Sequence, residues 1–70
     1  MARIVGVDIP NNKAISVSLT YIHGIGSFVA RKILSEVGVE PNLHAGKLTE
    51  DEVSRIAQII DRDYIVEGQL

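Results

Sequence analysis

Apolar residues in the middle of the chain recur at helical spacing. Over residues 27–37 they fall three or four positions apart, which places them on one helix face, while Arg31 and Lys32 fall outside that face. Gly38 follows at the position where a left-handed residue commonly ends a helix. The pattern therefore predicts a helix over residues 27–37 whose apolar face consists of Val29, Ile33, Leu34 and Val37.

A second helix is predicted to begin after Thr49. Thr49 and Glu52 have the spacing of a capping box, in which each side chain accepts a hydrogen bond from the other residue's backbone amide. The acidic residues at 50–52 also suit the positive end of a helix dipole. We therefore do not interpret them as a catalytic or metal-binding group. The apolar stripe of this helix consists of Val53, Ile56, Ala57 and Ile60.

Residues 14–22 fit two periodicities. Alternation of apolar and polar residues is typical of a strand, and isoleucine, valine and threonine favour strands over helices. Ile15, Leu19 and Ile22 also have the spacing of one helix face, and either of the asparagines at 11 and 12 would cap such a helix. The pattern alone predicts a strand.

The two ends of the chain are predicted to be extended. Arg3–Pro10 is short and rich in β-branched residues, which is typical of a strand, and the asparagines that follow favour a turn. Tyr64–Val66 also favours an extended conformation. We expect it to pair with Ile4–Val7 in a small two-stranded ribbon.

The turn Gly24-Ile25-Gly26 comes just before the first predicted helix. Glycine permits a positive φ and a close backbone approach. Ile25 is expected to point into the core, and Ser27 to cap the helix. The first-turn amides and the helix dipole would then face outward, as in a phosphate site, with His23 approaching the ligand or covering the turn. A G-x-G turn is a weak motif, and on spacing alone a tight connection without a ligand is the commoner interpretation.

Length and charge limit the classes of function. Seventy residues make one domain with a small core, and without cysteine the chain has neither disulfides nor thiolate-bound zinc. The formal net charge of −2 is unfavourable for an independent nucleic-acid-binding protein, because Lys and Arg supply most of such affinity. The residues form no catalytic or metal constellation, so we expect no enzyme activity, metal or cofactor. No apolar run approaches the roughly 20 residues of a membrane span, and we expect no membrane partner.

Long segments of the sequence resemble a known family. Residues 2–13 (ARIVGVDIPNNK) and 19–26 (LTYIHGIG) closely resemble the opening of the thirteenth protein of the small ribosomal subunit, in its bacterial or organellar form. Residues 47–53 (KLTEDEV) and 66–70 (VEGQL) agree as well. The resemblance covers essentially the whole chain in order, which makes it far more specific than the G-x-G turn.

The resemblance implies a helix–two-turn–helix fold. In that fold residues 14–22 are a short helix, against the strand that the pattern alone predicts. The expected fold class is therefore mainly α, with three short helices in a single domain over residues 1–70. The ribbon of the N- and C-terminal segments completes it.

The resemblance also implies a structural, non-enzymatic role in translation, on a cytoplasmic or organellar ribosome. Members of the family bind small-subunit ribosomal RNA in the head of that subunit. They contact large-subunit RNA and a large-subunit protein at inter-subunit bridges, and they neighbour another head protein. By this resemblance the expected RNA-binding residues are Arg3, Lys13, His23, Gly24, Gly26, Ser27, Arg31 and Lys32.

The family pattern continues further than this sequence does. Members extend into a long helix and a strongly basic tail that reaches the tRNA sites, whereas this sequence stops at Leu70. Contact with tRNA and most of the electrostatic affinity for RNA are therefore not expected of these residues. Two alternatives remain, a helix–two-turn–helix module that binds DNA and a protein–protein module that uses the acidic face of the last helix. A comparison of duplex DNA with ribosomal RNA tests the first, and the salt dependence of binding tests the second.

Overall fold

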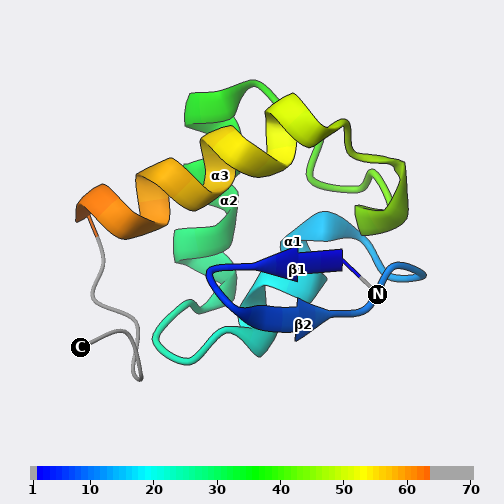
Figure 1. The fold of residues 1–70 in the computed structure, drawn as a ribbon, viewed down its shortest axis with the longest axis horizontal. Helices are drawn as coiled ribbons and strands as arrows, with labels where there is room; N and C mark the ends of the chain where they lie inside the picture. The colour runs from blue at the N-terminus through cyan, green and yellow to red at the C-terminus, as the bar shows by residue number, and fades with distance from the viewer. Residues whose placement is uncertain (1, 64–70) are drawn as a thin grey trace.

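The computed structural model describes residues 2–63, which form three helices and a short ribbon (Figure 1). The elements follow one another as β1 (Ala2–Ile4), β2 (Val7–Ile9), α1 (Ile15–Ser18), the 3₁₀ turn η1 (Leu19–Tyr21), α2 (Ser27–Val37), the 3₁₀ turn η2 (Ala45–Lys47) and α3 (Glu50–Asp63). The predicted fold class, mainly α with a small two-stranded ribbon, is confirmed.

The N-terminal segment folds back on itself as a hairpin. β1 and β2 pair antiparallel with Ile4 opposite Val7, and the two residues between them both have positive φ, 46° at Val5 and 79° at Gly6. These dihedrals are typical of a type I′ turn, whose twist matches that of the flanking strands. The sequence predicts one continuous strand here, and that prediction is wrong. The pattern did not reveal the turn because valine rarely occupies a turn position with positive φ. The ribbon therefore consists of two N-terminal strands, and Tyr64–Val66, its expected C-terminal strand, lies outside the described residues.

Residues 14–22 are helical, because α1 and η1 follow each other directly. The side chains of Ile15, Leu19 and Ile22 are fully buried, as helical spacing requires. The strand that the pattern predicts is therefore wrong, and the helix that the resemblance implies is confirmed. The helix begins at the N-cap Ala14 with no side-chain cap, so the predicted asparagine cap is also wrong.

Hydrogen bonds from a distant part of the chain explain this outcome. The first amides of a helix have no partner within the helix. Here the amides of Ile15 and Ser16 donate to the carbonyls of Leu43 (2.7 Å) and Pro41 (3.1 Å), in the loop after α2. These bonds, together with the burial of one apolar face, outweigh the strand propensity of the segment.

The start of α3 and the end of α2 are determined locally. The Thr49 amide donates to Glu52 Oε1 (2.9 Å) and the Glu52 amide donates to Thr49 Oγ1 (3.1 Å), so the predicted capping box is confirmed. At the end of α2, Gly38 has a φ of 85°. The amides of Gly38 and Val39 donate to the Leu34 carbonyl over 2.8 and 3.0 Å, which satisfies an acceptor that the helix end would otherwise leave open.

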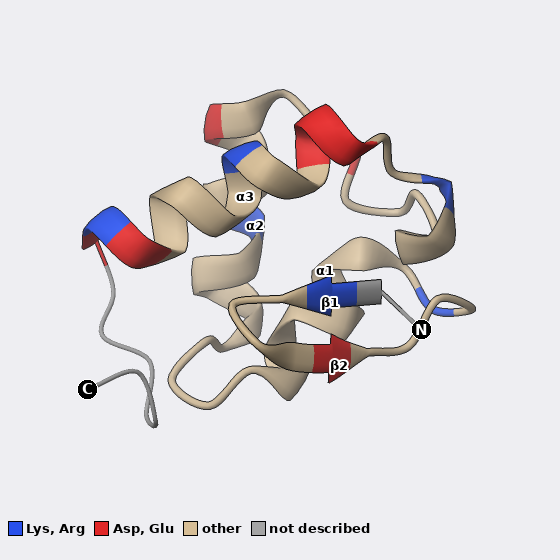
Figure 2. Cartoon of the chain, viewed as in Figure 1, with Lys and Arg blue, Asp and Glu red and all other residues tan. Residues whose placement is uncertain are grey.

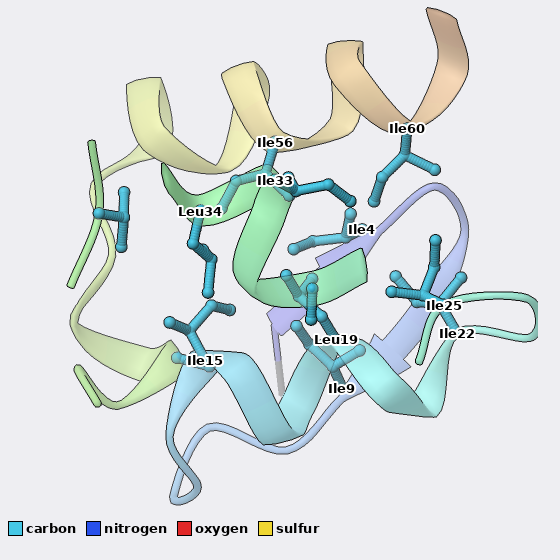
Figure 3. Packing of buried hydrophobic residues seen from close by; sticks show 13 residues of the cluster. Ile4, Ile9, Ile15, Leu19, Ile22, Ile25, Ile33, Leu34, Ile56 and Ile60 are labelled. Atoms are coloured by element: carbon cyan, nitrogen blue, oxygen red, sulfur yellow. The ribbon is translucent and has the colours of Figure 1, made fainter. Parts of the chain in front are cut away.

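The core lies between the three helices and the ribbon, and α2 contacts α1, η1 and α3 around it. Most of its buried side chains are isoleucines (Figure 3). Ile22 and Ile25 lie together at one end of this cluster, so the core anchors the G-x-G turn (Figure 3). No helix within residues 2–63 has the length and apolar character that crossing a bilayer requires.

Candidate nucleic-acid interface

The G-x-G turn joins η1 to α2 and exposes its two glycines. Ile25 is only 4% exposed and its amide donates to the Ile22 carbonyl over 3.0 Å, so it points into the core as predicted. Gly24 and Gly26 on either side are exposed. Gly24 has a φ of 92°, which only glycine adopts without strain. The central residue of the turn, Ile25, is thus buried in the core, while the two glycines face solvent.

α2 starts one residue earlier than an N-capping Ser27 requires. Gly26 is the N-cap, Ser27 is the first helical residue, and the helix has no side-chain cap. The predicted capping role of Ser27 is therefore wrong. Within residues 2–63 no hydrogen bond engages the amides of Gly26, Ser27 or Phe28, and the first bond of the helix runs from the Ala30 amide to the Gly26 carbonyl (2.9 Å). These amides lie at the positive end of the helix dipole.

Gly26 is not required by the fold. Its φ of −90° and ψ of 179° are allowed for any residue. A Cβ built on it would have no heavy atom within 4 Å. The space outside the turn is therefore open, and a ligand could approach the backbone there to contact distance.

Three exposed side chains follow the turn on α2. Arg31 and Lys32 are exposed, as predicted, about one helical turn beyond Ser27. Phe28 is 79% exposed. Sequence reasoning missed Phe28 as a surface residue, although it falls outside the apolar stripe of the helix and that signal was present in the sequence.

Acidic and paired residues dominate α3. Figure 2 shows acidic residues over its first turn, with Arg62 and Asp63 at its other end. Arg62 contacts Asp63 (2.6 Å) and Glu36 of α2 (3.7 Å). The hydrogen bonds from Arg62 lower the pKa of the Asp63 carboxyl, and Lys32 lowers it further through its charge. Residues 2–63 contain no group of three or more side chains suited to holding a metal ion.

Comparison with known proteins places these features in a family. Residues 3–69 match the family model described as ribosomal protein S13/S18. The chain belongs to this family. It is 43% identical over its whole length to the small ribosomal subunit protein uS13 of Protochlamydia amoebophila, of which it covers 57%. It is 46% identical over its whole length to the small ribosomal subunit protein uS13 of Rhodopirellula baltica, of which it covers 55%. The chain thus spans a little over half the length of these relatives.

Membership of the S13/S18 family confirms the resemblance from which we expected a helix at residues 14–22. The family consists of ribosomal proteins and not of enzymes, as expected.

In this member of the family the predicted RNA-binding residues fall into separate groups. His23, Gly24, Gly26 and Ser27 form the exposed turn, and the two cations of α2 follow it. The loop at residues 10–14, which carries Lys13, lies toward the opposite end of the longest axis (Figure 1). Arg3 lies on the ribbon, 3.8 Å from Asp8 on the paired strand. The structure therefore does not bring Arg3 and Lys13 to the turn.

Proposed function

We propose that this chain is a structural constituent of the small ribosomal subunit and binds small-subunit ribosomal RNA through the turn at Gly24–Ser27. The observation that carries the proposal is the family match through this turn, combined with the exposure of its glycines and the unengaged amides of Gly26 and Ser27. A helix N-terminus of this kind suits a phosphate group, because its amides and dipole both favour negative charge.

Arg31 and Lys32 are proposed to support that contact. Both are exposed on α2 close to the turn, where they would neutralise phosphates on either side of the one held by the amides. The net charge of −2 limits how much affinity the chain gains from electrostatics. Recognition is therefore proposed to depend on the shape of the turn and its close approach to the RNA.

The remaining partners follow from the resemblance. We propose contacts with large-subunit RNA and a large-subunit protein at inter-subunit bridges, and with a neighbouring protein in the head of the small subunit, on a cytoplasmic or organellar ribosome. The acid-rich start of α3 is the surface best suited to a protein partner, because it would repel phosphates. Contact with tRNA is assigned to the basic tail of the family and not to residues 1–70.

Replacing Gly26 with alanine tests the RNA contact with little effect on the fold. The added methyl group meets no protein atom within 4 Å but stands where the RNA backbone would approach. We expect Gly26→Ala to weaken binding to a head-region fragment of small-subunit RNA about fivefold or more, the equivalent of losing ~1 kcal/mol of contact. Fluorescence anisotropy at low salt measures this change.

Gly38→Ala is the matched control. Gly38 also has open space around its Cβ position, but its φ of 85° makes alanine strained by ~1–2 kcal/mol. This variant is therefore less stable, yet it is changed at the opposite end of α2 from the turn, and we expect its RNA affinity to remain that of the unmodified protein. Equal affinities for the Gly26→Ala variant and the unmodified protein would contradict the proposed contact.

A further inference from the structure

Phe28 is the only phenylalanine of the sequence, and it is unusually exposed for a large apolar residue. It is the second residue of α2 and keeps 79% of its surface in solvent. The buried residues of α2 (Ala30, Ile33 and Leu34) lie on a different face of the helix. The ring therefore contributes little to the core, and its place directly after the exposed turn has no explanation in the packing of residues 2–63.

The neighbours of Phe28 on the helix surface are cations. Residues three and four positions apart lie next to each other on an α-helix, so Arg31 and Lys32 both adjoin Phe28. Neither forms an ion pair with another residue of the 2–63 range. On the other side of Phe28 are the unengaged amides of Gly26 and Ser27. The ring thus stands between two groups that attract anions.

We propose that Phe28 is a stacking platform for an unpaired RNA base next to the phosphate held at the turn. This inference rests on the proposed function, in which the turn contacts a phosphate. It adds a second contact, between Phe28 and a base. An aromatic ring stacks on the flat face of any base, while adjacent cations follow the backbone, so the combination favours single-stranded RNA without strong sequence preference.

Charge favours RNA over a protein as the occupant of this surface. The central parts of protein–protein interfaces are depleted of charged residues. Phe28 instead has two cations beside it and unengaged donors before it on the same helix. These groups are complementary to the alternation of bases and phosphates along an unpaired strand.

The aromatic signals of Phe28 provide the test. Because the sequence contains one phenylalanine, its ring protons give one unambiguous set of NMR signals. The full chain is titrated with an RNA hairpin that has an unpaired loop and, separately, with a blunt RNA duplex of the same length. We expect the ring signals to shift upfield with the hairpin and to shift much less with the duplex, because the bases inside a duplex are already stacked on one another and only its two end pairs are open.

Substitutions separate stacking from simple apolar contact. We expect Phe28→Tyr to bind the hairpin as the unmodified chain does, and Phe28→Leu, which is apolar but not aromatic, to bind it about tenfold more weakly. Tyr21→Leu is the matched control, because it removes another aromatic ring that is 54% exposed but lies on η1. This control should retain its affinity for the hairpin, and an equal loss in both leucine variants would overturn the proposal.

The outcomes distinguish this inference from the proposed function. If the hairpin shifts the amide signals of Gly26 and Ser27 but not the Phe28 ring, the stacking proposal fails and the phosphate contact stands; this is the result expected if a protein covers Phe28. If neither RNA perturbs the turn or the ring, both proposals fail.

Discussion

At the scale of single residues, two glycines show how differently the same amino acid is used. Gly26 has open space around it and an ordinary backbone conformation. A Cβ at Gly46 would lie 3.0 Å from Asn11 Cβ and 3.3 Å from the Asn11 carbonyl oxygen. The Gly46 amide also donates to that carbonyl over 3.1 Å. Gly46 is therefore required for packing, whereas the fold leaves Gly26 open to substitution.

Alanine should destabilise the protein more at Gly46 than at Gly26. Gly46→Ala forces the Asn11 backbone away and is expected to destabilise the protein by ~1–3 kcal/mol, as overpacking does. Gly26→Ala is expected to change the free energy of unfolding by less than ~1 kcal/mol, because alanine restricts the unfolded chain but is a poorer N-cap than glycine. Urea denaturation followed by circular dichroism measures both, and equal stabilities would contradict the packing argument.

At the scale of elements, local signals set the end of α2 and the start of α3, while long-range contacts set the start of α1. The capping box and Gly38 operate within a few residues of their helix, so the sequence predicts them directly. The N-terminus of α1 depends on carbonyls of Pro41 and Leu43. Between α2 and α3 the exposed contact of Arg62 with Glu36 is a surface ion pair, of a kind that contributes little to stability.

The carboxyl group of Asp63, the last residue of α3, should have a pKa below the ordinary value of an aspartate. Hydrogen bonds from Arg62 lower the pKa of Asp63 from the usual 3.8. Because the folded pKa is below the unfolded one, the pair stabilises the protein above the unfolded value, and this contribution is lost as the pH falls through the folded value. We expect NMR titration of the Asp63 carboxyl to give a pKa below 3.8, and the Arg62→Gln variant to raise it.

If the pKa of Asp63 does not respond to the Arg62→Gln change, the hydrogen bonds from Arg62 to the Asp63 carboxylate do not persist when the protein is in solution.

At the scale of the whole molecule, charge limits what residues 1–70 achieve alone. The chain has nine acidic and seven basic residues, and three of the acids lie together in the first turn of α3 (Figure 2). The cations proposed to meet RNA are two neighbours on α2. Binding therefore depends on few phosphate contacts, and the protein is expected to hold RNA weakly by itself.

Salt dependence measures the number of those contacts. Two neutralised phosphates on a single strand give a slope of about −1.4 in a plot of log affinity against log salt, so affinity should fall about sevenfold between 50 and 200 mM salt. The measurement is a titration of the chain with the loop-containing hairpin at several salt concentrations. A double Arg31→Gln, Lys32→Gln variant should flatten the slope, and tight binding that resists salt would contradict this account of the interface.

The sequence by itself determined the features that depend on near neighbours: the span of α2, its left-handed end at Gly38, the capping box of α3 and the inward position of Ile25. The family resemblance added the helix at residues 14–22, which propensity alone assigns to a strand. Only the tertiary structure decided the hairpin at Val5 and Gly6 and the start of α1 after Ala14. The physical reason is range: caps and periodic faces form within a few residues, whereas a turn with an unusual residue and a helix start without a side-chain cap depend on packing between segments distant in the chain.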